Sequence, residues 1–190
     1  MAKAKTLSST ELRRVLDYVA TRPHAQRNRL AVLLTHWGGM RVGEVAALRY
    51  VDVLNVDGSV KDEIYLSAEQ TKGRYGRTVF ISAKLRKEIA AYVAVKKVKD
   101  WEYSLLYTQK NPKRGFTPNT LTQYFLSLYR NVGLAGASSH SGRRSYLTSL
   151  ANKGTAIHIL KALAGHRNIS TTAEYLYSSP TQLKAAVELV

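Results

Sequence analysis

The chain has 190 residues, contains no cysteine, and carries 29 Lys and Arg against 13 Asp and Glu, a formal net charge of +16. This length favours one domain whose core needs no disulfide or metal. The absence of cysteine excludes disulfide frameworks, thiolate nucleophiles and zinc sites with cysteine ligands. No stretch resembles a secretory signal or an apolar run of about 20 residues that would span a bilayer. We therefore expect a cytoplasmic protein that is not bound to a membrane.

Positive charge is concentrated between residues 71 and 144, where 15 basic and 3 acidic side chains give a net charge of +12. Phosphates attract Lys and Arg and release counterions on contact, so this segment favours a nucleic acid partner. The alternatives are a solvated basic surface and an anionic membrane. No strongly amphipathic basic helix with exposed aromatic residues supports the membrane.

Helical signals open the chain. Ser8 and Glu11 form a capping-box pattern, and apolar residues at helical spacing then predict a helix that ends before Pro23. A second apolar helix is expected over residues 25–37, and a short one over 42–48 follows the glycine pair that ends it.

A β-hairpin is expected in the middle of the chain. A turn at 55–58 precedes two strand-like runs, residues 64–66 and 78–81, which are joined by the basic, glycine-containing segment 71–77. The rest reads as a loop through 111–115 and as helices over about 83–99, 119–131, 142–153, 155–164, 170–177 and 181–189. The expected fold class is mainly α with a small antiparallel β-sheet (α+β).

Several residues along the chain are suited to phosphoryl transfer; Arg41 stands at a break between helices and Lys72 in the hairpin tip. Each is weak evidence alone, since an arginine beside glycines is usually structural and a tyrosine on a late helix usually packs in the core or at its rim. Their order is more informative, because a tyrosine follows a Gly-His pair by nine positions. In chain order the set is Arg41, Lys72, His140, Arg143, His166 and Tyr175.

This ordered set resembles the catalytic signature of the tyrosine recombinases, the phage-integrase family. The flanking residues agree: GMRVGE at 39–44, HSGRRS at 140–145 and LAGHRNISTTAEY at 163–175 resemble three sequence boxes of that family. The resemblance runs from about residue 8 to 178 and implies the catalytic-domain fold of these enzymes.

The resemblance implies DNA cleavage and rejoining with no metal or other cofactor. Tyr175 would attack a phosphodiester and keep the 3′ end as a phosphotyrosyl ester, which conserves the bond energy so that no nucleotide is consumed. Arg41 and Arg143 would stabilise the charge that develops on the non-bridging oxygens, because a guanidinium bonds two oxygens at once and stays charged.

The remaining roles concern protons and positioning. Lys72 would protonate the leaving 5′ oxygen, and His140 would assist Tyr175 by acid–base exchange. His166 would donate to a non-bridging oxygen and hold Tyr175 in place. Three further arginines are expected to contact DNA phosphates rather than to catalyse: Arg74, Arg77 and Arg144.

Several residues have rival interpretations. Tyr177 is the main alternative nucleophile, but on a helix it points about 200° away from Tyr175. Glu44 lies in the first box, where a structural partner role is expected. We assign three histidines to structure or surface: His24, His36 and His158. Four carboxylates would fit a two-metal nuclease, but they cluster around one turn and lack partners elsewhere, which favours a solvated hairpin: Asp52, Asp57, Asp62 and Glu63.

Family members commonly carry a helical core-binding domain before the catalytic one, whereas the first arginine box here begins about 40 residues from Met1. We expect a single catalytic domain over 1–190, flexible over 1–7, that resembles short members such as the fimbrial phase-switch recombinases or is an isolated catalytic fragment. An apolar stripe on the last helix, within 180–190, docks either on its own core or in trans on the next protomer, as the resemblance favours.

The expected function is therefore site-specific recombination of double-stranded DNA in a bacterial or phage-infected cell. The protein would be a monomer when free and a tetramer on paired sites, with accessory DNA-bending proteins as further partners. Two alternatives stay open: a relaxer that resembles type IB topoisomerases, and a catalytically silent DNA-binding regulator. The complete catalytic set argues against the silent regulator, because pure binding needs no tyrosine at that spacing.

Overall fold

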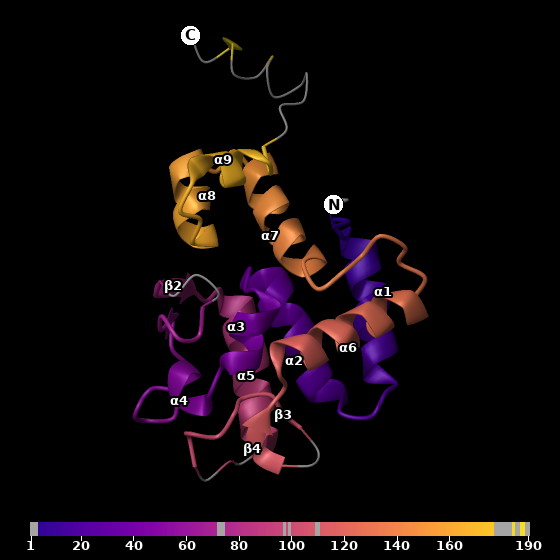
Figure 1. Ribbon diagram of the computed structural model, residues 1–190, viewed down its shortest axis with the longest axis vertical. Helices are drawn as coiled ribbons and strands as arrows, with labels where there is room; N and C mark the ends of the chain where they lie inside the picture. The colour runs from indigo at the N-terminus through magenta and orange to yellow at the C-terminus, as the bar shows by residue number, and fades with distance from the viewer. Residues whose placement is uncertain are drawn as a thin grey trace. The chain divides into compact units, whose positions relative to one another are not determined.

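The computed structural model describes residues 4–71, 75–96, 98, 100–108, 111–176, 184 and 187–188. The chain divides into two compact units, Met1–Tyr146 and Leu147–Val190. The first unit holds α1 (Ser9–Ala20), α2 (Ala25–Trp37), α3 (Val42–Ala47), α4 (Tyr50–Val53), β1 (Glu63–Leu66), β2 (Arg77–Phe80), α5 (Ala83–Lys96), β3 (Tyr107–Thr108), β4 (Asn111–Gly115) and α6 (Pro118–Asn131). Helix α7 (Ser141–Asn152) begins in it, and α8 (Ile157–Ala164) and α9 (Ile169–Ala173) lie in the second unit (Figure 1).

Helix α2 forms the centre of the first unit. It contacts α1, α3 and α5, and its residues 30–35 are all buried. Helix α1 begins at the predicted capping box, in which the Ser8 hydroxyl accepts from the Glu11 N–H and the Glu11 carboxylate accepts from the Ser8 N–H. The apolar face that helical spacing predicted for α1 is buried. Both N-terminal helices are confirmed.

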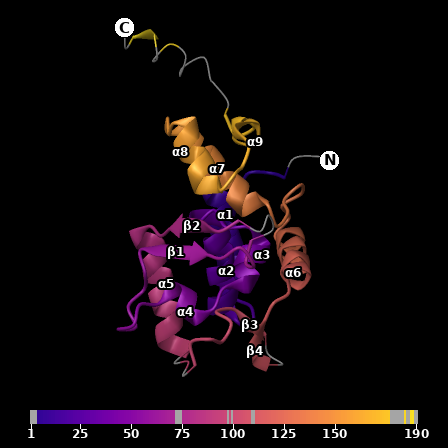
Figure 2. The ribbon, with the colours of Figure 1, turned by 60° about the vertical axis from the view of Figure 1, so that its left-hand side comes forward.

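The predicted hairpin is also confirmed. Strands β1 and β2 pair antiparallel, with Leu66 opposite Arg77 and Ile64 opposite Val79 (Figure 2). Alternate residues point inward, so Ile64, Leu66 and Val79 are buried in the core. Residues 72–74 at the tip, which include Lys72 and Arg74, lie outside the described residues.

Three features differ from the prediction. Helix α9 ends at Ala173, so Tyr175 lies past its end rather than on a helix that runs to residue 177. Strands β3 and β4 form a second antiparallel pair where a loop was expected through residues 111–115, and the four-residue helix α4 was not foreseen. Both are short, and Pro112 in β4 lacks the N–H that a strand ladder uses, so periodicity carries little signal there. The fold is mostly helical with small antiparallel sheets, as predicted, but it has two hairpins rather than one.

Residues near the start of the chain are hydrogen-bonded to the rest of the first unit, although flexibility was expected over residues 1–7. The Lys5 N–H donates to the Gly136 carbonyl oxygen at 3.0 Å, the Leu7 N–H donates to the Ser145 hydroxyl at 2.7 Å, and the Leu7 side chain is buried. Residues 5–7 therefore pair with the loop and helix start that contain the second arginine box. Among the described residues, no helix combines the length and the apolar character needed to cross a membrane.

The second unit is built from the end of α7 with α8 and α9. Helix α8 ends at Gly165, whose φ of 58° is the left-handed conformation that glycine adopts at low cost. Asn168 caps α9 by accepting from the Ser170 N–H. The expected helix over 181–189 lies almost wholly outside the described residues; a backbone hydrogen bond from Glu188 to Lys184 has helical spacing, and Val187 is 72% exposed.

Candidate active site

A buried carboxylate lies at the centre of the first arginine box. Glu44, in the first turn of α3, is 1% exposed, and its Oε2 accepts from the Arg41 N–H at 2.7 Å while its Oε1 accepts from Arg41 Nη1 at 2.9 Å. From strand β2, Arg77 donates through Nε to Oε1 at 3.1 Å and through Nη2 to Oε2 at 2.7 Å. We call these three residues the Arg41–Glu44–Arg77 cluster.

The cluster satisfies the carboxylate completely. A carboxylate has about four acceptor positions, and these four hydrogen bonds occupy two on each oxygen. Burial alone would raise the pKa of Glu44, but hydrogen bonds and positive charge from Arg77, and then from Arg41, outweigh it and hold the pKa below its usual value. Glu44 is therefore ionised at neutral pH, and the cluster carries one net positive charge.

Arg77 does not occupy the solvent-facing position that we expected for a phosphate contact. Its side chain is 7% exposed, and its guanidinium donates two hydrogen bonds to the Glu44 carboxylate. Strand alternation contains the missed signal, since Arg77 lies two residues before the buried Val79 and so points to the same inward face. The expected structural partner role of Glu44 agrees with this geometry.

The second arginine box is tied to the first through a backbone carbonyl. Arg143, in the first turn of α7, is 4% exposed, and its Nη1 donates to the Gly39 oxygen at 2.7 Å. Gly39 has a φ of +61°, and a Cβ there would lie 2.4 Å from Cδ1 of Tyr146. Only glycine fits this position, so the turn that presents Arg41 also anchors Arg143.

His140 stands immediately before α7 and is exposed. Its N–H donates to the Ser138 hydroxyl at 3.3 Å, and the Ser138 N–H donates to Ser141 Oγ at 2.9 Å. Arg144 follows on α7 and is half-buried. The first unit thus brings Arg41, Arg143 and His140 onto two neighbouring segments, which the sequence separates by about 100 residues.

The second unit brings His166 and Tyr175 together. Their rings are stacked, with centroids 5.9 Å apart and planes inclined by 20°. Nδ1 of His166 lies 3.0 Å from Oγ1 of the buried Thr172, and the Tyr175 N–H donates to the Thr172 carbonyl oxygen. Thr172 therefore contacts both residues, a part that sequence reasoning had not assigned to it although it lies in the third box. Tyr177 lies outside the described residues.

Three of the four carboxylates in the rival nuclease interpretation have other partners. Asp52 accepts from the Arg49 N–H and from Gln70, Asp57 caps its own turn at Ser59, and Asp62 pairs with Arg86. Within the described ranges, no group of three or more His, Asp or Glu side chains is placed to hold a metal ion.

The three histidines left outside the site occupy dissimilar places. His158 is exposed, and His24 precedes α2 with a φ of 61°. His36 is largely buried; burial, and then the charge of Lys84, lower its pKa to about 4.

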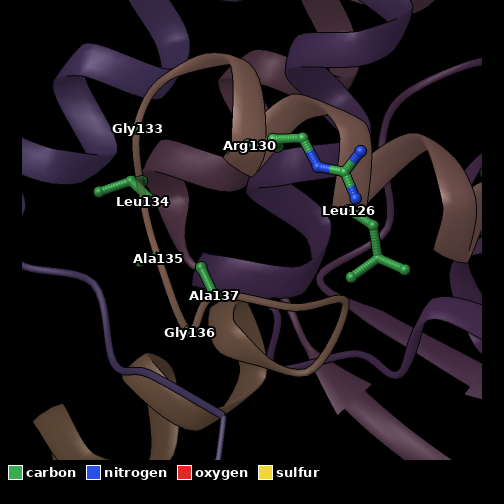
Figure 3. A pocket seen from close by; sticks show the side chains of 7 residues that line it. All are labelled: Leu126, Arg130, Gly133, Leu134, Ala135, Gly136 and Ala137. Carbon is green, nitrogen blue, oxygen red and sulfur yellow. The ribbon is translucent and has the colours of Figure 1, made fainter.

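One pocket of about 360 Å³ lies at the end of α6 and the loop that follows it (Figure 3). Its lining is mostly apolar, with Arg130 as its charged residue. None of the expected site residues lines it.

Comparison with known proteins agrees with this arrangement. The model of the phage integrase family matches residues 5–182. The tyrosine recombinase XerA of Pyrococcus furiosus is 28% identical over 184 residues, 97% of this chain and 61% of that protein. XerA of Thermococcus onnurineus is 30% identical, with 97% and 62% covered. The chain thus spans about three fifths of the length of these curated relatives.

Solved structures show the same fold. A crystal structure of XerA recombinase matches with a TM-score of 0.75 at 20% identity, over 100% of this chain and 66% of that one. The catalytic domain of bacteriophage HP1 integrase matches with a TM-score of 0.66 at 19% identity, over 98% of this chain and 95% of that one. With a family match over nearly its whole length, the chain belongs to the phage integrase family and has the catalytic-domain fold of the tyrosine recombinases.

Proposed function

We propose that this chain cleaves and rejoins double-stranded DNA at specific sites through a covalent 3′-phosphotyrosine. The observation that carries the proposal is the contact between His166 and Tyr175: a histidine ring stacked on a tyrosine at the family's spacing, with its Nδ1 held by Thr172. In the other unit, two arginines with strongly anchored guanidiniums supply positive charge for a phosphate.

Each step uses groups of this chain, the DNA and water. The Tyr175 hydroxyl attacks the phosphorus, its proton passes to His140 or to water, and the bond to the 5′ oxygen breaks as Lys72 protonates that oxygen. Arg41, Arg143 and His166 donate to the two non-bridging oxygens as their charge grows. Rejoining reverses these steps, with a 5′ hydroxyl attacking the phosphotyrosine.

The DNA partner and its assembly are part of this proposal. Solved relatives include XerH bound to its difH substrate and the Tn1549 integrase in complex with transposon end DNA. For this chain we expect binding to duplex DNA with Arg74 and Arg144 on phosphates, a monomer when free and a tetramer on paired sites, with a DNA-bending protein as a further partner.

The experiment uses duplexes of randomised sequence, each with a nick that lets the strand beside the cleavage point diffuse away. The wild-type protein should form an adduct that survives denaturant and is recovered with its DNA sequence. Tyr175→Phe should bind the recovered sequence and form no adduct, whereas Tyr177→Phe should still form one. An adduct with Tyr175→Phe, or none with the wild type, would contradict the proposal.

Recombination and relaxation are then separated with the recovered sequence. Two labelled duplexes carrying it should exchange strands and give recombinant products. Relaxation of a supercoiled plasmid without exchange would favour the topoisomerase-like alternative, and binding without any adduct would favour the silent regulator.

A further inference from the structure

Arg77 donates two hydrogen bonds to Glu44, although it lies 33 residues further along the chain and on a different element. The exposed fractions of the three side chains rise from 1% for Glu44 to 7% for Arg77 and 27% for Arg41. Arg41 is thus the member that opens to solvent, and Arg77 stands behind the carboxylate. A guanidinium in that place cannot reach a DNA phosphate without leaving its partner.

Arg77 fixes the orientation in which the Glu44 carboxylate contacts Arg41. Its two parallel donors bind one lone pair on each oxygen, which fixes the plane of the carboxylate. The remaining lone pair on Oε2 holds the Arg41 backbone, and that on Oε1 holds its Nη1. The orientation of the Arg41 guanidinium is therefore set from β2.

The net charge of the cluster supports the same role for Arg77. Arg41 and Glu44 alone would be a neutral pair, and a neutral pair attracts a phosphate poorly. The second guanidinium restores one net positive charge to the cluster, and it does so from a buried position where water screens little. The lowered pKa of Glu44 agrees, because that carboxylate stays ionised despite its burial.

We propose that Arg77 is a positioning residue for Arg41: it holds and neutralises Glu44 so that Arg41 meets the scissile phosphate oriented and with its positive charge uncancelled. The inference rests on the proposed function and deepens it. It also replaces the expected phosphate contact of Arg77 with a role inside the protein.

A purely structural role is the competing explanation, since the same contacts tie the hairpin to α3. The two differ in what happens when both charges are removed. When Arg77 alone is lost, the negative charge of Glu44 cancels the positive charge of Arg41. When the charges of Arg77 and Glu44 are lost together, Arg41 keeps its positive charge. A structural tie is broken equally in both cases, so only the charge role predicts rescue.

The experiment measures single-turnover cleavage of the nicked duplex at saturating protein. Arg77→Met should lower the rate constant by about 10- to 100-fold, as removal of outer-shell partners does elsewhere, and Arg77→Met with Glu44→Gln should recover to within about 5-fold of wild type. Arg29→Met, which opens the half-exposed Arg29–Glu88 pair on α2 and α5, is the matched control and should leave the rate unchanged.

Binding provides the second readout. Because the cluster loses its net positive charge in Arg77→Met and regains it in the double variant, the slope of log K against log salt should fall in the single variant and recover in the double one, whereas a direct phosphate contact by Arg77 would lower the slope by about 0.9 in both variants. A full rate in Arg77→Met, a double variant as slow as the single one, or a salt slope that stays reduced in the double variant would each overturn the inference.

Thermal unfolding checks that the variants fold. If Arg77→Met does not fold, the folded double variant is compared with wild type directly, and a rate more than 10-fold below wild type then overturns the inference. Failure of the proposed function is a separate result, because in that case the wild-type protein itself forms no adduct in the same assay.

Discussion

His36 and Glu44 show how burial sets the charge of single residues in opposite ways. Both lie within the first unit, but Glu44 has four hydrogen bonds that favour its ionised form. For Nδ1 of His36, no partner is present among the described residues, and the imidazole stays neutral. Burial without a partner lowers the pKa of a histidine, and burial with cationic partners still leaves a carboxylate charged.

The pKa of about 4 for His36 predicts how stability depends on pH. The unfolded chain binds a proton near pH 6.5 and the folded chain only near pH 4, so stability is complete above pH 6.5 and falls as the pH drops through this window. The loss approaches about 3 kcal/mol by pH 4. Urea unfolding at several pH values should show this decline in the wild type and a flatter one in His36→Gln. The exposed His158→Gln is the control, and an equal decline in His36→Gln would contradict the assignment.

At the residue scale, site residues could be predicted where they belong to a sequence motif. They could not be predicted where their role depends on a contact inside the folded protein. The spacing of His166 and Tyr175 is visible in the sequence, and the structure places their rings together. The Arg77–Glu44 contact joins residues 33 positions apart, and in the sequence Arg77 looks like one more basic residue of a cationic loop. Only the inward alternation with Val79 hints at it.

Helices and strands followed their local signals to different degrees. The capping box predicted the start of α1, and the glycine pair predicted the end of α2. By contrast, β3 has two residues and its pairing with β4 is irregular, so no periodicity precedes it. An element this short is formed by its surroundings rather than by its own propensity.

Two glycines at element starts should respond to the same substitution with opposite signs. A Cβ on Gly142 would lie 2.3 Å from Oγ1 of Thr35 and 3.1 Å from its carbonyl carbon, whereas a Cβ on Gly43 would lie 3.8 Å from Pro118. Gly142→Ala should therefore destabilise the protein by about 1–3 kcal/mol, and Gly43→Ala should stabilise it by up to about 1 kcal/mol through helix propensity. Chemical unfolding measures both, and equal effects would contradict the close approach of α7 to α2.

Thr172 on α9 offers a test of how His166 is held. Thr172→Val keeps the shape but removes the hydroxyl that lies 3.0 Å from Nδ1 of His166. A lost hydrogen bond of about 0.5–1.5 kcal/mol should slow adduct formation by roughly 2- to 10-fold. The exposed neighbour Thr171→Val should have the wild-type rate. Equal rates in both variants would show that the threonine does not position the histidine.

On the scale of the whole molecule, the family could be predicted from the sequence, whereas the assembly could not. Net charge and the order of the site residues led from the sequence to the family, which a match over residues 5–182 supports. The proposed number of subunits depends on contacts between copies of the chain. No periodicity within one chain encodes which copy a terminal helix contacts.

Assembly can be tested by deleting residues 181–190. Burying three aliphatic side chains of this segment in trans would supply about 4–6 kcal/mol before ordering costs, enough to couple neighbours on DNA but not in solution. The deletion should therefore abolish complexes of several protomers on paired sites and hardly shift the melting temperature of the monomer. Unfolding of the truncated monomer would instead place the helix on its own core.

The covalent link is the central claim, and its location can be measured directly. The wild-type protein is incubated in excess EDTA with the nicked duplex, the adduct is digested with protease and nuclease, and the nucleotide-bearing peptide is sequenced by mass spectrometry. We predict one modified peptide, with a 3′-nucleotide phosphate on Tyr175 and an undiminished yield in EDTA. A phosphate on Tyr177 or on any other residue, or an adduct that forms only when Mg²⁺ or Mn²⁺ is restored, would contradict the mechanism.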